Sequence, residues 1–147
     1  MDDIRAAFAR DHERLGLLLE AALGRIAAGD AAGCAAALTT FARHLRTHIR
    51  IEEEVVFAAI ERLPDEPVAQ MSLASLRREH EVFRVFLGAI EQSLGRGQLQ
   101  GIGYDLRELA AAFRLHHGRE EQVIYPLLEN TLHAATIVDM AAMLGKD

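Results

Sequence analysis

The stretch His48-Ile49-Arg50-Ile51-Glu52-Glu53 carries a histidine and a glutamate four residues apart. On an α-helix, residues at this spacing lie one turn above the other, with Cβ atoms about 5–6 Å apart. Both side chains can therefore reach one cation on the same helix face. The spacing returns 68 residues later in His116-His117-Gly118-Arg119-Glu120-Glu121, so the chain contains two copies of one pattern.

A histidine between two acids precedes each copy. The first stands in Asp11-His12-Glu13, and its histidine lies 36 residues before His48. The second stands in Glu79-His80-Glu81, and its histidine lies 36 residues before His116. The equal spacings predict that both halves bring the same side chains to one shared site.

Length and composition fit a single globular domain. The chain has 147 residues, half of them hydrophobic and only 3 of them proline, which is enough to bury a core and argues against disorder. We predict one domain over residues 1–147, built of two repeats at about 8–63 and 76–131. The net charge of −6 argues against nucleic acid as a partner, because phosphate binding needs a basic surface.

The sequence also bears on where the protein acts. No apolar run approaches the roughly 20 residues needed to cross a bilayer, so we expect no membrane contact. No signal peptide is visible at Met1-Asp2-Asp3, and the single cysteine, Cys34, cannot form an internal disulfide. We therefore expect a cytoplasmic protein, either a monomer or a homodimer.

Apolar residues recur at three- and four-residue steps along most of the chain, which predicts amphipathic helices. The predicted helices cover about 3–28, 30–63, 67–94 and 104–130, followed by a short helix at 134–144. No segment alternates with period two, and the connections are short. The fold class is therefore all-α, an antiparallel up-down-up-down four-helix bundle with a short C-terminal fifth helix.

Acidic and proline residues predict several helix ends and one bend. Asp2 or Asp3 can cap the first helix, and Pro64 ends the second. Pro67 opens the third helix, since its missing N–H costs nothing in the first turn. Pro126 should bend the last turns of the fourth helix, because it removes one backbone hydrogen bond. The fifth helix is expected to close one end of the bundle, with a subunit contact as the alternative.

Six polar residues interrupt the apolar stripes of these helices: His12, His48, Glu52, His80, His116 and Glu120. Burying two unpaired carboxylates in a core is costly, so something positive must lie between them. The chain has only one lysine, Lys146, and no arginine shares all the stripes. A pair of metal ions is the simplest answer, and imidazole with carboxylate suits iron, manganese or zinc.

Geometry suggests a role for each candidate ligand. Glu52 and Glu120 would bridge two metals about 3.5–4 Å apart. The pair His12 and His48 would hold one metal, and the pair His80 and His116 would hold the other. An oxygen from solvent would add a further bridge, leaving a position open for a small molecule.

Other polar residues near these stripes are ambiguous. His44 lies one turn before His48 and is either an extra imidazole ligand or a residue that orients a ligand. Glu53 and Glu121 either orient imidazoles or face solvent. His117 lies about 100° from its stripe and is expected at the surface. His133, beyond the fourth helix, is not expected to bind metal.

This pattern resembles the hemerythrin-like (HHE cation-binding) family over roughly residues 8–130. The match rests on a histidine followed four residues later by Glu-Glu and then by an aliphatic-aromatic-Pro triplet, as in Ile124-Tyr125-Pro126; in the first copy Ala58 replaces the proline. The resemblance implies a non-haem di-iron centre, oxo- or hydroxo-bridged, with other divalent metals as alternatives. Oxygen-carrying members have a further histidine where this chain has Arg84, and they bridge with one aspartate and one glutamate. The broader HHE group therefore fits better than a dedicated oxygen carrier.

Three functions are consistent with this resemblance. The favoured one is binding or sensing of a small ligand such as oxygen or nitric oxide, because the sequence shows no further catalytic chemistry. The alternative is an enzyme: a di-iron oxidoreductase acting on nitric oxide or peroxide, or an iron-handling protein of iron–sulfur repair. The third is a structural bundle with an incidental metal or zinc. The signatures of ferritin-like di-iron proteins and of zinc metalloproteases are absent from the sequence.

Overall fold

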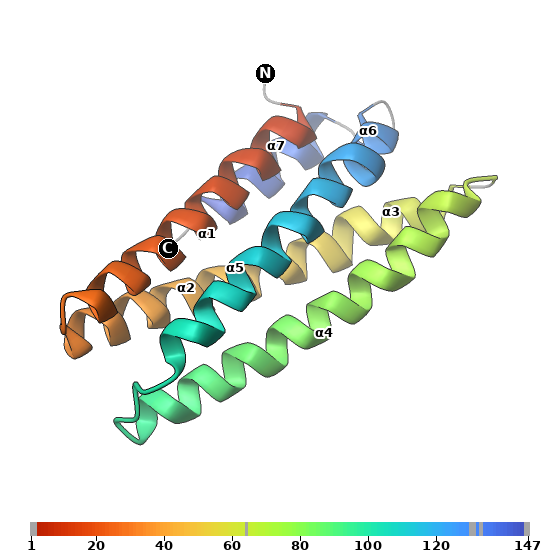
Figure 1. The fold of residues 1–147 in the computed structure, drawn as a ribbon. Helices are drawn as coiled ribbons and strands as arrows, with labels where there is room; N and C mark the ends of the chain where they lie inside the picture. The colour runs from red at the N-terminus through yellow and green to blue at the C-terminus, as the bar shows by residue number, and fades with distance from the viewer. Residues whose placement is uncertain (1–2, 64, 130–131, 133, 146–147) are drawn as a thin grey trace.

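The computed structural model is an antiparallel four-helix bundle with a short helix along its side (Figure 1). It describes residues 3–63, 65–129, 132 and 134–145. The first and third long helices are α1 (Ile4–Ala27) and α4 (Pro67–Gly95). The second and fourth are each built of three consecutive segments: α2 (Ala31–Ile51), η1 (Glu52–Phe57) and α3 (Ala58–Glu61), then α5 (Ile102–Arg119), η2 (Glu120–Ile124) and α6 (Tyr125–Leu128). The predicted all-α bundle is confirmed.

The helix ends follow the local chemistry of the sequence. Asp3 caps α1, because its Oδ1 accepts a hydrogen bond of 2.7 Å from the backbone N–H of Ala6. Pro67 stands in the first turn of α4, as predicted. Helix α5 begins two residues earlier than predicted, after Gly101, whose φ of 87° suits glycine. Pro64 lies outside the described residues.

Two π-helical segments interrupt the second and fourth long helices, a feature that the sequence did not predict. They begin at Glu52 and at Glu120, the two candidate bridging carboxylates. Pro126 follows the second segment, but Ala58 stands at the matching place after the first. The proline therefore does not cause the π turn, since the same turn forms without it. Such turns are frequent at functional sites.

Buried apolar side chains form two separate clusters, one toward each end of the bundle. One contains Phe8, Phe57, Leu76, Tyr125 and Met140 among its members. The other contains Leu15, Leu38, Phe41, Leu87 and Phe113 among its members. The candidate ligands occupy the level between the two clusters. A polar layer therefore crosses the bundle between two hydrophobic cores.

The short helix α7 (Ala134–Leu144) packs against α1 and α2. Its residues Ile137, Met140 and Leu144 are buried in the first of the two apolar clusters, whereas Val138 points outward and is 55% exposed. The sequence predicted that this helix closes one end of the bundle, but the structure places it along the side, where it packs against α1 and α2 (Figure 1). None of the described helices has the length and hydropathy needed to cross a membrane.

Candidate metal centre

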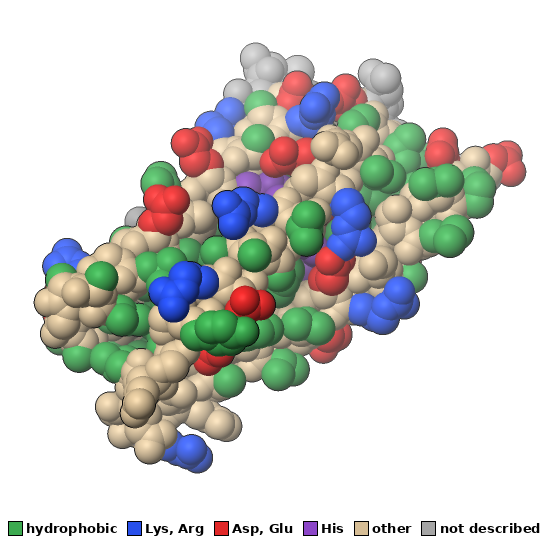
Figure 2. Space-filling view, viewed as in Figure 1, with side chains coloured by type: hydrophobic (Ala, Val, Ile, Leu, Met, Phe, Trp, Pro, Cys, Tyr) green, Lys and Arg blue, Asp and Glu red, His purple; other side chains and the backbone are tan. Residues whose placement is uncertain are grey.

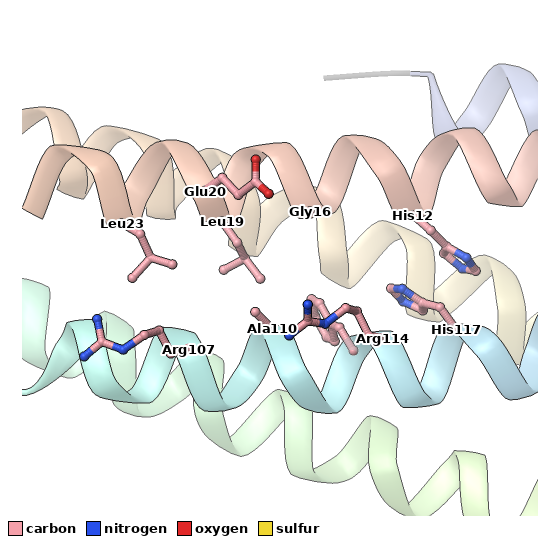
Figure 3. A pocket seen from close by; sticks show the side chains of 10 residues that line it. His12, Gly16, Leu19, Glu20, Leu23, Arg107, Ala110, Arg114 and His117 are labelled. Carbon is pink, nitrogen blue, oxygen red and sulfur yellow. The ribbon is translucent and has the colours of Figure 1, made fainter. Parts of the chain in front are cut away.

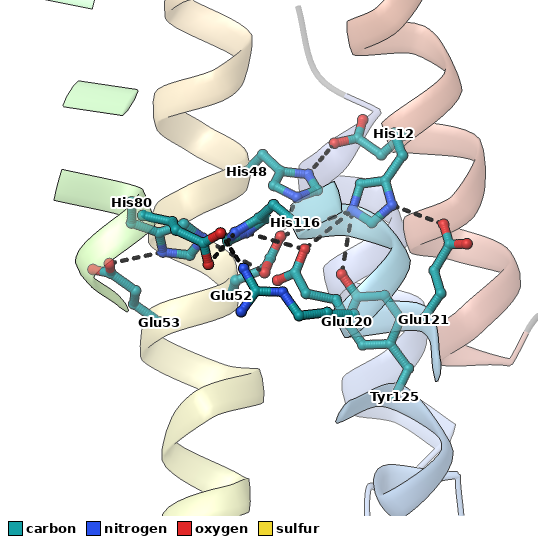
Figure 4. Close-up of polar contacts among 12 residues, drawn as sticks. His12, His48, Glu52, Glu53, His80, His116, Glu120, Glu121 and Tyr125 are labelled. Carbon is teal, nitrogen blue, oxygen red and sulfur yellow. Dashed lines mark hydrogen bonds and ion pairs between the residues drawn. The ribbon is translucent and has the colours of Figure 1, made fainter. Parts of the chain in front are cut away.

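The four long helices each bring one histidine to the same level of the bundle, and the two π segments add a glutamate each (Figure 4). All six side chains are buried: His12, His48, Glu52, His80, His116 and Glu120. In the part of the chain that the structure describes, potential ligand atoms fall into two groups, each within 4.8 Å. One group contains His12, His48, His117 and Glu120, and the other contains Glu52, His80, His116 and Glu120.

Glu52 turns one carboxylate oxygen toward each histidine pair. Its Oε1 contacts Nε2 of His48 and lies 4.0 Å from Nε2 of His12. Its Oε2 lies 3.8 Å from Nε2 of His80. A carboxylate in this position can bind two cations, one through each oxygen.

Glu120 lies between the same two histidine pairs. Its Oε1 is 3.3 Å from Nε2 of His116 and 3.7 Å from Nε2 of His12. Nε2 of His80 and Nε2 of His116 are 3.0 Å apart, so these two imidazoles converge on one point. The inner edges of the four rings and both carboxylates therefore enclose a common space.

The outer nitrogen, Nδ1, of each of these histidines faces a carboxylate. The distances are 2.9 Å from His12 to Glu121, 2.5 Å from His48 to Asp11, 2.9 Å from His80 to Glu53, and 3.5 Å from His116 to Glu79. A carboxylate at this place fixes the ring orientation and leaves Nε2 available to a metal. Glu53 and Glu121 thus take the orienting role that the sequence left open.

The pairs of a histidine Nδ1 with a carboxylate follow the same 68-residue repeat as the six candidate ligands. The pair Asp11 and His48 corresponds to Glu79 and His116, within one repeat each. The pairs with Glu53 and Glu121 cross between repeats. The sequence contained this signal, because Asp11 and Glu79 precede the leading histidines at matching positions.

The buried polar atoms of this layer fit a cation. Nε2 of His48 and both carboxylate oxygens of Glu52 and of Glu120 are buried and form no hydrogen bond. Buried carboxylates in this state are costly unless a positive charge compensates them. Imidazole nitrogens with carboxylate oxygens are donors that suit iron, manganese or zinc. The residues present therefore fit bound metal.

The protonation of the imidazoles follows from their surroundings. Burial lowers the pKa of His116 to about 3 and also lowers the pKa of His80, so both rings are neutral. Burial acts against protonation of His48 as well, but the charges of Glu52 and Asp11 raise its pKa to about 9. Burial would raise the pKa of Asp11, but hydrogen bonds from His44 and His48 lower it to about 2. A proton on His48 thus compensates Glu52 when no metal does.

His44 lies on Asp11 and belongs to neither ligand group. Its Nε2 is 2.6 Å from Oδ1 of Asp11, and the other oxygen of Asp11 accepts a hydrogen bond from Nδ1 of His48. The structure therefore places His44 behind a candidate ligand, which was the alternative to direct ligation. His133 lies outside the described residues.

The prediction that His117 lies at the surface holds only in part, because the side chain is half-buried beside His12. Its ring stacks on that of His12, with centroids 3.6 Å apart and planes 3° apart. Burial, and then the charge of His12, holds its pKa well below the ordinary range. The error was to equate distance from the stripe with exposure, because positions beside the stripe face the neighbouring helix in a bundle. The repeat-related residue, Ile49, is buried and could have shown this.

The two histidine pairs differ in their immediate surroundings. The hydroxyl of Tyr125 lies 3.3 Å from Nε2 of His12. At the repeat-related position, Phe57 stacks on His80 with centroids 5.2 Å apart. The pair that contains His12 is therefore in the more polar environment.

Fold and site together define a four-helix bundle with a metal-binding layer of histidines and carboxylates. Comparison with protein families matches residues 3–128, and also residues 72–147, to the family described as Hemerythrin HHE cation binding domain. The chain belongs to this family. No curated protein and no solved structure matched the chain in the same comparisons.

Proposed function

We propose that this hemerythrin-like protein holds two iron ions in a carboxylate-bridged centre and binds or senses a small ligand such as oxygen or nitric oxide. The observation that carries this proposal is the position of Glu52, which turns one oxygen toward each histidine pair. Such a centre supplies redox-active metal with a coordination position for an exogenous ligand. A metal pair of this kind explains why two carboxylates are buried without hydrogen bonds.

The residues would divide the work as follows. His12 and His48 would hold one metal, His80 and His116 the other, and Glu52 and Glu120 would bridge. Four outer carboxylates keep the imidazoles in place: Asp11, Glu53, Glu79 and Glu121. The two apolar clusters exclude bulk water from the layer in the directions of the two bundle ends.

The test is elemental analysis of protein purified anaerobically, followed by absorption spectra before and after exposure to oxygen or nitric oxide. We expect two irons per chain and a reversible spectral change. His116→Ala or Glu120→Ala should lose at least one metal, whereas the exposed Glu54→Ala should keep both. A loaded protein that shows no spectral change would contradict ligand binding, and ligand consumption faster than by free iron would favour an oxidoreductase instead.

A further inference from the structure

A groove between α1 and α5 leads from the surface to the metal centre. Its volume is about 400 Å³, and His12 and His117 stand at its inner end (Figure 3). On the same face of the molecule, a small area of histidine surface is visible in a narrow opening between charged side chains (Figure 2). A cavity of this size is typical of sites for organic molecules and is much larger than a diatomic gas requires.

The lining of the groove combines an apolar floor with a cationic rim. Apolar side chains of both helices form the floor: Leu19, Leu23, Ala110 and Phe113. Arg107 and Arg114 line the rim on α5, and Glu20 lies on the α1 side. Among the described residues, neither arginine has a carboxylate partner. The rim therefore carries excess positive charge and two available guanidinium groups.

Of the two repeat-related hollows in the described part of the chain, the one between α1 and α5 reaches the histidines. Gly16 lines it, and a Cβ built there would meet nothing within 4 Å. The repeat-related residue is Arg84, which bonds to Glu53 and Glu81 and fills the matching place beside His80. The related hollow between α2 and α4 is lined by residues such as Thr39 and Arg46, with no histidine among them. Access to the metal layer is therefore built into the His12 side.

We propose that this groove binds a small amphipathic organic anion. Its carboxylate lies at the rim between Arg107 and Arg114, because guanidinium groups form strong charge-assisted hydrogen bonds with carboxylates. Its aliphatic body covers the apolar floor, and its far end comes beside His12. This site goes beyond the proposed gas ligand and does not require metal for binding.

The test is calorimetric titration of the protein with octanoate, with and without metal. We expect saturable binding in both states, and binding of acetate or 1-octanol weaker by about tenfold or more, since each lacks one half of the ligand. Gly16→Leu should abolish binding by filling the groove, whereas Gly88→Leu, on the outside of α4 and away from the groove, should not. The double variant Arg107→Gln and Arg114→Gln should weaken octanoate about tenfold but leave 1-octanol unchanged, whereas Arg46→Gln should change neither.

Three outcomes would overturn this inference. The first is no measurable octanoate binding, and the second is binding that Gly16→Leu does not change. The third is binding that needs metal and ignores both arginines, which would place the carboxylate on the metal itself. Metal content, measured on every variant, separates this inference from the proposed di-iron function: failure to bind octanoate with two irons present affects only the groove.

Discussion

At the scale of single residues, Asp11 shows how a side chain that is not itself a ligand can set the geometry of a site. Its Oδ1 accepts a hydrogen bond of 2.6 Å from Nε2 of His44, and its Oδ2 accepts one of 2.5 Å from Nδ1 of His48. One carboxylate therefore orients two imidazoles. Among the described residues, the repeat-related Glu79 faces a single imidazole, that of His116, and the guanidinium of Arg119. The sequence showed both acids beside the leading histidines but not that they contact the histidine of another helix. That contact depends on how the helices are packed.

We expect Asp11→Asn to weaken metal binding by about 10–100-fold, because the amide cannot accept from both imidazoles as the carboxylate does. Glu79→Gln should act in the same direction. The measurement is competition with a chelator of known affinity. Glu13→Gln, in which an exposed acid next to His12 is neutralised, serves as control. Equal affinities for Asp11→Asn and Glu13→Gln would contradict the orienting role.

His117 offers a test of stacking against ligation. An imidazole binds a metal in the plane of its ring, so two parallel stacked rings cannot both bind the same metal. The stack therefore indicates that His117 covers His12 and is not a ligand beside it. We expect His117→Phe to keep both metals and the stack, and His117→Ala to lower the free energy of unfolding by about 1 kcal/mol. Metal analysis and urea unfolding measure the two effects. Loss of one metal in His117→Phe would make His117 a ligand.

The raised pKa of His48 gives a pH dependence with a definite sign. Because its pKa is about 9 without metal, the ring is protonated at pH 8, and a metal must displace that proton. We expect metal binding at pH 8 to release about one additional proton, the one displaced from His48. This additional release should vanish above pH 9–10, where the ring is already neutral. Calorimetry in buffers of different ionisation enthalpy measures it. In the metal-free protein, the same shift stabilises the fold fully below pH 6.5, and the effect is lost as the pH rises through 9.

At the scale of elements, the sequence predicted the helices well because each is amphipathic over many turns. The ends at Asp3 and Pro67 were predictable from capping chemistry. The π segments at Glu52 and Glu120 were not, since hydrophobic periodicity does not distinguish one wide turn from a regular one. The structure brings the six candidate ligands together at the level that the equal spacings indicated. Their binding of metal stays a prediction.

We expect Pro126→Ala to be tolerated, because the η1 segment forms the same π turn with Ala58 at the matching position. The change in the free energy of unfolding should stay within about 1 kcal/mol, as for other exposed sites, and the metal content should not change. Thermal unfolding and elemental analysis check both. Loss of metal in this variant would mean that the proline holds Glu120 in place.

At the scale of the whole molecule, a charged layer divides the core into two apolar halves. The layer contains two buried carboxylates that form no hydrogen bond, Glu52 and Glu120, and burial without a compensating charge opposes folding. The stability of the bundle should therefore depend on the metals more strongly than its apolar content suggests.

Chelation should lower the melting temperature of the natural protein, and the double variant Glu52→Gln and Glu120→Gln should remove this dependence. Without metal, we expect Glu120→Gln alone to be more stable than the natural chain by about 1–3 kcal/mol, because the buried charge of Glu120 lies beside the neutral ring of His116. Glu52→Gln should gain less, because it removes the partner of the protonated His48. Calorimetric melting with and without chelator measures both effects. A Glu120→Gln variant less stable than the metal-free natural chain would contradict this expectation.

Gly16 leaves space beside one half of this pseudo-symmetric centre, whereas Arg84 occupies the matching place beside the other half. The two halves present equivalent donors, but in the described part of the chain the groove beside Gly16 reaches His12, whereas the related hollow has no histidine in its lining. Two ions held there would therefore differ in how easily a small molecule reaches them. Such inequality requires no change to the donors themselves. The exchange Gly16→Arg with Arg84→Gly should close the approach beside His12 and open one beside His80.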